Sequence, residues 1–300
     1  GNVEGVFELK YPASFASDTL VARMVGYHNS YWPLDSAIEG DTLIIPMKPN
    51  PVRLDEVTVM PNEPSGRELM EAALDRIKDN YPTDPFIMNG FFRDLKLENE
   101  ECAFLLEAVV RIYDKKYHRA PRILRDLQER VAIDKIRATR NHISKEEWRE
   151  SLAKENALKE LLGNNLLRYQ YGPFGLSDEQ SYRRSHEVRL DSQLLYVVEV
   201  PEFPQTQIFI DSETFGIYKF IYKSEEERAL GNTGKPQDEE NELVVVSQHI
   251  QFEYQPYQGK LYLKYIVSNT KYEERQKDTG KAVHTSRLKL HLLVNSVETE

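Results

Sequence analysis

Two alternating stretches separated by a short polar turn constrain the fold of this chain most strongly. Residues 86–97 and 102–113 alternate apolar and polar side chains on either side of Asn99-Glu100. Alternation of period two around a polar turn is typical of a β-hairpin with one buried face. We therefore predict an antiparallel hairpin, and we expect one set of side chains to face the core together: Phe104, Leu106, Ala108, Val110 and Ile112.

Similar runs fill the last third of the chain. Residues 208–210 and 217–221 flank a polar turn at 211–214, which predicts a second hairpin. The same pattern predicts further strands at 195–200, 243–246, 249–254, 261–267 and 287–294. So many strands with short polar connections favour one large antiparallel sheet.

A helical start signal precedes the first hairpin. Ser65 and Glu68 form an S-x-x-E capping box. Apolar residues at helical spacing follow it: Met70, Ala73, Leu74, Ile77 and Tyr81. Pro82 cannot continue a helix, so the sequence predicts a helix that ends near Tyr81.

A second helical region is predicted between the two sets of strands. From about residue 121 to 167 the apolar spacing changes to a helical period, and Ser144 with Glu147 forms another capping box. We expect the helix that starts there to turn its apolar residues inward and to end at Gly163-Asn164-Asn165: Trp148, Leu152, Leu158, Leu161 and Leu162.

The first sixty residues carry an ordered series of short β-type phrases. A Gly-x-Phe-x-Leu strand at 5–9 precedes a Gly-Tyr turn at 26–27, an alternating stretch at 41–47 and an L-x-E-V-x-V exit at 54–59. This series resembles the second half of the carboxypeptidase-like regulatory domain, a small β-sandwich common at the front of Bacteroidota cell-envelope proteins. The resemblance implies a partial sandwich over residues 1–60, whose unpaired edges a second copy of the chain could cover.

The second hairpin carries a further resemblance. Ile208-Phe209-Ile210-Asp211, followed by Thr214 and Ile217, is similar to the central hairpin of the lipoprotein-carrier half barrel. We therefore expect an α+β chain of two parts. A partial regulatory-domain-like β-sandwich at 1–60 precedes a domain at 61–300, built from a large antiparallel sheet of half-barrel type with packed helices and a helical insert at about 121–167.

Composition excludes several classes of function. The net charge of −10 disfavours a nucleic-acid binder, which normally has a basic surface. No run approaches the roughly 18 apolar residues that span a bilayer. We expect a leader to have been removed before Gly1, and the resemblances place the chain in the periplasm or at the outer membrane. The single cysteine, Cys102, excludes an internal disulfide, and its alternating neighbours predict a buried strand thiol.

Motifs for catalysis are weak. None of the seven histidines stands three or four residues from another, and H-E-x-x-H is absent. Ser151-Leu152-Ala153-Lys154 matches S-x-x-K but lacks the companion S-D-N motif. We assign no catalytic, metal or cofactor residue and expect no cofactor.

Two surfaces are candidates for binding. By alternation, apolar residues of the last strands form a possible groove on the concave face, which either packed helices or an acyl chain could fill: Leu195, Val197, Ile208, Ile210, Ile217, Phe220, Leu261, Leu263 and Tyr265. A possible basic patch for anionic lipid or an acidic partner consists of Lys115, Lys116, Arg119, Arg122, Arg125 and Arg130.

These features favour a non-enzymatic envelope protein that binds a partner protein or an amphiphile, or serves as a scaffold. The alternative is a hydrolase of envelope glycans or peptides, with a site assembled from dispersed acids and histidines. A groove would favour the first hypothesis, and a pocket with clustered carboxylates of shifted pKa would favour the second.

Overall fold

The structure is a computed structural model, and all structural statements below concern the residues that it describes: 15, 17–24, 27–34, 43–49, 63–117, 129–140, 157–190, 193–203, 205–230 and 240–299.

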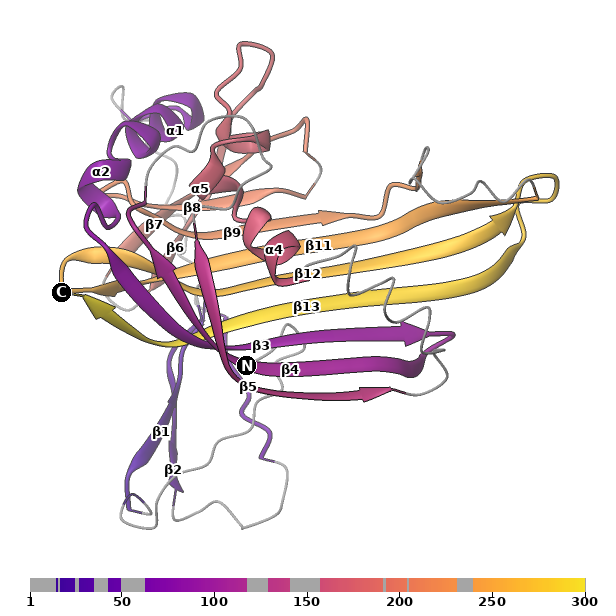
Figure 1. The fold of residues 1–300 in the computed structure, drawn as a ribbon. Coiled ribbons are helices and arrows are strands. Elements are labelled where there is room, and N and C mark those ends of the chain that lie inside the picture. Colours follow the sequence, from indigo (N-terminus) through magenta and orange to yellow (C-terminus); the bar gives the residue numbers. More distant parts are fainter. Residues whose placement is uncertain are drawn as a thin grey trace.

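A large open antiparallel sheet dominates this part of the chain (Figure 1). Its strands follow the order β5-β4-β3-β13-β12-β11-β9-β8-β7-β6, and β10 pairs with β11 beside this path. Their bounds are β3 (Phe86–Glu98), β4 (Glu101–Asp114), β5 (Arg130–Arg140), β6 (Arg183–Leu190), β7 (Gln193–Glu199), β8 (Gln207–Asp211), β9 (Ile217–Ser224), β10 (Arg228–Ala229), β11 (Asn241–Tyr257), β12 (Lys260–Gln276) and β13 (Ala282–Thr299).

The hairpin predicted around Asn99-Glu100 is confirmed. Strands β3 and β4 pair from Phe86 with Asp114 to Glu98 with Glu101. Asn99 and Glu100 both have positive φ, 49° and 67°, as a two-residue hairpin turn requires. Of the residues expected to face the core, Ala108, Val110 and Ile112 are buried in it and Leu106 packs against it half-buried, whereas Phe104 is buried outside the core cluster.

Strand register defines the two faces of the sheet. Directly paired residues point to the same side, so one row crosses the sheet on what we call the helical face: Val198, Ile208, Phe220, Phe252, Ile266, Leu292, Phe92 and Ala108. The neighbouring row defines the outer face: Val197, Phe209, Lys219, Glu253, Tyr265, Leu293, Phe91 and Val109.

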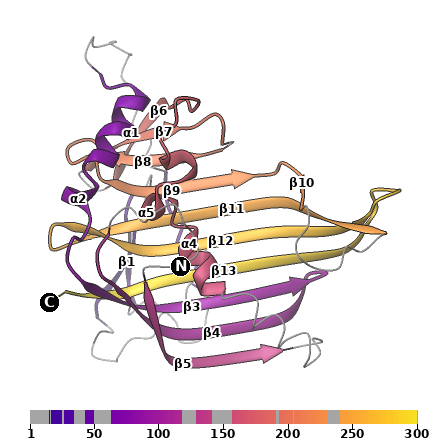
Figure 2. The same cartoon turned by 45° about the horizontal axis from the view of Figure 1, so that its top comes forward.

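Short helices accompany the sheet: α1 (Gly66–Asp75), α2 (Ile77–Asn80), α4 (Ala157–Gly163), α5 (Leu166–Tyr169) and the 3-10 turn η3 (Gly172–Phe174). The first capping box is confirmed, because Ser65 Oγ accepts from the Glu68 N–H at 3.3 Å and Glu68 Oε2 accepts from the Ser65 N–H at 2.8 Å. Figure 2 shows α4 lying across strands β12 and β13, which it contacts.

Part of the predicted helical insert is instead a strand. Residues 130–140 form β5, which pairs antiparallel with β4. The apolar spacing of this segment would also fit a helix. Pairing with β4 prevails because it satisfies the backbone N–H and C=O groups that β4 would otherwise leave without hydrogen bonds. The end of the insert agrees with the prediction, since Leu158, Leu161 and Leu162 are buried in α4, which ends at Gly163. Ser144, Trp148 and Leu152 lie outside the described residues.

The described residues among the first sixty form only isolated β structure, so the partial sandwich expected over 1–60 stays a prediction. Strands β1 (Thr19–Ala22) and β2 (Ser30–Pro33) form a separate two-stranded antiparallel sheet. Residues 43–48 form no regular strand, and Pro49 makes only an isolated bridge to Tyr27. Pro46 explains why the alternating pattern fails there, because proline cannot donate to a ladder. The phrases at 5–9 and 54–59 lie outside the described residues.

Candidate functional site

The helical face of the sheet is packed against aromatic and leucine side chains. The ring of Phe174 lies 5.4 Å from that of Phe220 and 6.1 Å from that of Phe252, which stack on each other at 4.8 Å. Leu161 and Leu162 of α4 join the same apolar core. We call residues 157–174, which include α4, α5 and η3, the cover.

A cluster of tyrosines fixes the cover next to α2. Tyr81 stacks on Tyr117 with ring centroids 4.6 Å apart, and the hydroxyls of Tyr117 and Tyr254 lie 2.5 Å from each other. Tyr254 donates to Asn165 Oδ1 at 2.7 Å, and the same oxygen accepts from the backbone N–H of Arg168 at 3.2 Å. Burial raises the pKa of Tyr81, Tyr117 and Tyr254, so these phenols stay neutral and act as hydrogen-bond partners.

Charged side chains are buried beside the tyrosines. Arg168 of α5 is 2% exposed, and its Nη2 lies 3.0 Å from Asp114 Oδ1 at the end of β4. Its Nε lies 3.8 Å from Glu129 Oε1, just before β5, and Tyr169 donates to Glu129 Oε2 at 2.7 Å. We call Asp114, Glu129, Arg168 and Tyr169 the Arg168 cluster. It joins the cover to strands that lie far from it in sequence.

The Arg168 cluster contains a carboxyl group with a strongly shifted pKa. Burial, together with the negative charge of Glu129, raises the pKa of Asp114 to about 6 against the opposing effect of Arg168. One guanidinium therefore faces two carboxylates, and the second carboxylate is only partly compensated.

A small cavity lies at this cluster. Asp114, Arg168 and Asn165 line it together with apolar side chains of the sheet and of α4: Phe86, Met88, Leu162, Leu261 and Leu263. It has room for about one water molecule. The carboxylates could bind a proton or orient a water there, but a glycan or peptide does not fit between them in this closed arrangement.

The outer face contains a different buried carboxylate. Glu107, whose side chain is 2% exposed, accepts from Arg93 Nη2 at 2.6 Å and also from Arg137. Although burial raises the pKa of Glu107, these hydrogen bonds lower it below its ordinary value. Elsewhere on this face the Lys219 ammonium lies 5.5 Å from the Phe209 ring centroid, and burial lowers its pKa.

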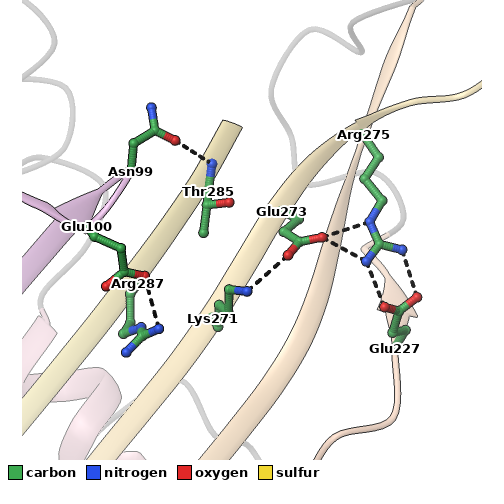
Figure 3. A network of polar contacts seen from close by, with 8 residues as sticks. All are labelled: Asn99, Glu100, Glu227, Lys271, Glu273, Arg275, Thr285 and Arg287. Carbon is green, nitrogen blue, oxygen red and sulfur yellow. Dashed lines mark hydrogen bonds and ion pairs between the residues drawn. The ribbon is translucent and has the colours of Figure 1, made fainter. Parts of the chain in front are cut away.

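Charged side chains at the far end of the sheet form a partly exposed network (Figure 3). Arg275 binds both Glu227 and Glu273, at 2.6 and 2.8 Å, and Lys271 reaches Glu273 at 3.0 Å. Arg287 pairs with Glu100 at the hairpin turn. Arg275 therefore joins β12 to the segment before β10, and Arg287 joins β13 to the turn between β3 and β4.

The predicted groove residues divide between the faces. Ile208, Ile210, Ile217, Phe220, Leu261 and Leu263 lie in the core on the helical face. Register places the other predicted members, Leu195, Val197 and Tyr265, on the outer face, although Leu195 and Val197 are also fully buried in the core. Tyr265 differs from its neighbours because a bulge at Lys264 shifts the register, and its hydroxyl contacts Glu253 at 3.1 Å.

Other predicted positions are more scattered. Lys115, Lys116 and Arg130 are exposed, whereas Arg119, Arg122 and Arg125 lie outside the described residues, as does the S-x-x-K stretch. Cys102 is half-buried in β4. Within the described ranges, no group of histidine, cysteine and acidic side chains is arranged to hold a metal ion.

Sequence reasoning missed the Arg168 cluster altogether. Arg168 follows Leu166-Leu167 in an apolar run, and Asp114 ends an alternating strand at an inward-facing position. A charged residue at a position that the pattern makes apolar was the signal available for each of them.

Comparisons with known proteins identify no family. No family model matches the chain, and no curated protein matches it. The solved structure of a LolA superfamily protein from Nitrosomonas europaea is 12% identical, with a TM-score of 0.27, over 78% of this chain and 95% of that one. A putative outer membrane lipoprotein-sorting protein domain from Vibrio parahaemolyticus is 11% identical, with a TM-score of 0.32, over 76% and 91%.

Neither structure is described as a carboxypeptidase-like regulatory domain. That resemblance, and the Bacteroidota origin that it implies, stay predictions. Among the described helices, none has the length and apolar character needed to cross a bilayer.

Proposed function

We propose that this chain is a non-enzymatic, amphiphile-binding protein of the cell envelope, and that the apolar part of its ligand lies on the helical face beneath the cover. The observation that supports this most is the apolar row that crosses the sheet without interruption from Val198 in β7 to Ala108 in β4. Such a row is long enough to receive an extended acyl chain.

A ligand could displace the cover. Its helices contain seven, four and three residues, which is too short to be stable alone in water. Their stability comes from apolar contacts of Leu158, Leu161, Leu162 and Phe174 with the core. An acyl chain offers the sheet the same chemistry, so it can replace these contacts at little net cost.

The described arrangement is the closed state in this proposal. The cavity at the Arg168 cluster has room for about one water molecule, so an amphiphile binds only after the cover moves. The free energy of opening is then subtracted from the intrinsic affinity. Weakening the contacts between cover and sheet should therefore strengthen binding.

The test is titration with a fluorescent fatty-acid analogue. We expect binding at micromolar concentration by the wild type. Leu162→Ala should raise the affinity at least about tenfold, because truncating a buried leucine weakens the closed state by more than 1.4 kcal/mol. Phe220→Asp should abolish binding, with circular dichroism to verify that the sheet still forms.

Val109→Ala is the matched control, because Val109 lies on the outer face and is 42% exposed. It should bind as the wild type does. The proposal would be wrong if neither the wild type nor Leu162→Ala bound the probe. It would also be wrong if Leu162→Ala and Val109→Ala lowered the affinity for the probe equally.

A further inference from the structure

The Arg168 cluster is unbalanced in charge. Asp114 and Glu129 face the single guanidinium of Arg168. The remaining described groups packed around Asp114 add no cation: Lys116 contributes its backbone N–H at 3.2 Å, and the phenols nearby are Tyr117, Tyr169 and Tyr254. With both carboxyls ionised, the residues of the Arg168 cluster therefore carry one net negative charge.

The cluster lies where the cover meets the sheet. Arg168 belongs to α5 in the cover, whereas Asp114 ends β4 and Glu129 precedes β5. Displacing α5 would separate Arg168 from both carboxylates and expose all three to water. The environment of Asp114 thus differs between a closed and an open cover.

We propose that closure of the cover is coupled to the uptake of one proton by the Arg168 cluster, at Asp114. The proposal rests on the opening of the cover that the proposed function requires, but not on any ligand. Both hydrogen bonds donated to Asp114 by the described residues end on Oδ1, so Oδ2 is the atom that takes the proton from water on closing and returns it on opening.

The direction of the coupling follows from the two states of the carboxyl group. In the closed state burial raises the pKa of Asp114 to about 6, whereas a hydrated aspartate has a pKa near 3.9. The closed state therefore binds the proton more tightly, so acid favours closing. As the pH rises through about 6, the closed state acquires an uncompensated charge and opening becomes easier. The full effect is about a hundredfold in the opening equilibrium.

The first experiment is a carbon NMR titration of the wild type labelled at aspartate, with Asp114→Asn to assign the signal. We expect the Asp114 carboxyl to titrate with a midpoint near 6. A midpoint near 4 would overturn the proposal. The titration itself uses the wild-type protein, and the Asp114→Asn variant serves only to assign the signal.

The second experiment is amide hydrogen exchange of residues 157–174 in the wild type and in Asp114→Asn, compared at each pH so that intrinsic exchange rates cancel. At pH 4 the two should be protected alike. At pH 8 the wild type should exchange up to about a hundredfold faster than Asp114→Asn, which keeps the neutral pair of Arg168 and Glu129.

Asp134→Asn is the control, because Asp134 pairs with Arg111 at the surface. It should follow the wild type at every pH. Identical pH dependence in the wild type and Asp114→Asn, or faster opening of the wild type in acid, would refute the coupling. Loss of probe binding with the coupling intact would instead refute only the proposed function.

Discussion

Strand β4 carries two buried carboxyl groups on opposite faces of the sheet, and their pKa values are shifted in opposite directions. Glu107 on the outer face has two arginines, one 37% and the other 81% exposed, and its pKa is lowered. Asp114 on the helical face shares one buried arginine with Glu129, and its pKa is raised. Both side chains are almost inaccessible to water, but Asp114 is desolvated more deeply than Glu107, so the depth of burial and the number of cations together account for the difference.

The difference assigns separate roles to the faces. Glu107 fastens β3, β4 and β5 together and is best satisfied when ionised. The Asp114 carboxyl group is most stable when it is protonated or exposed to water. Its partner Arg168 belongs to the short helices of the cover. The outer cluster therefore stabilises the sheet, whereas the helical-face cluster can respond to a change in its surroundings.

The largest effect should come from Arg168→Ala. This change leaves Asp114 and Glu129 buried without a cation, and we expect it to cost about 3–5 kcal/mol of unfolding free energy at pH 7. Urea denaturation measures it. Arg111→Ala, which removes an exposed partner of Asp134, is the control and should cost less than about 1 kcal/mol. If Arg168→Ala and Arg111→Ala lowered the unfolding free energy by similar amounts, the buried ion pair would stabilise the fold no more than the exposed one.

The next effect concerns pH. The folded pKa of Asp114 lies above its unfolded value, so its contribution to stability is fully present below about pH 4 and is lost as the pH rises through about 6. The difference in unfolding free energy between Asp114→Asn and the wild type should therefore grow by up to about 3 kcal/mol from pH 4 to pH 7. A difference that does not vary with pH would show that Asp114 is already satisfied as an anion.

Glu107→Gln should act in the opposite sense. The folded pKa of Glu107 is lowered, so its stabilisation is present above its unfolded pKa and is lost as the pH falls through the folded value. We expect a cost of about 1–3 kcal/mol at pH 7 that shrinks in acid. Thermal melts at pH 7 and pH 3 measure it, and a cost that is larger in acid would contradict the comparison.

The smallest effect should come from Arg137→Ala. Arg137 is 81% exposed, and Glu107 keeps Arg93 as a partner. We expect less than about 1 kcal/mol, measured in the same urea series. A cost equal to that of Arg168→Ala would mean that the outer cluster depends on each of its arginines.

The sheet could be predicted from the sequence where pairing is local. The hairpin of β3 and β4 and that of β8 and β9 follow from alternation and polar turns, and the capping box at Ser65 locates α1. Strands β11 to β13 are longer than predicted, because their polar distal ends are held by polar contacts between segments, such as Asn241 in β11 with Glu274 in β12 and Arg275 with Glu227. Residues 130–140 were misread because their pairing with β4 is a long-range contact.

The site was harder to predict than the fold. Alternation found apolar residues of the helical face, such as Ile208 and Phe220, but a bulge moved Tyr265 to the other side. The Arg168 cluster joins residues 114, 129 and 168, and no single window of sequence contains all three. The net charge of the cluster arises only when the folded chain brings these three residues together.

Photo-crosslinking tests the central claim, binding on the helical face, most directly. A monoacylglycerol with a diazirine in its acyl chain would be bound, irradiated and mapped by tandem mass spectrometry to single residues. The account predicts labels on the cover and on helical-face positions such as Phe220 and Phe252. Labels confined to the exposed outer-face residues Val109 and Leu293, or no label at a concentration that saturates the fluorescent probe, would contradict it.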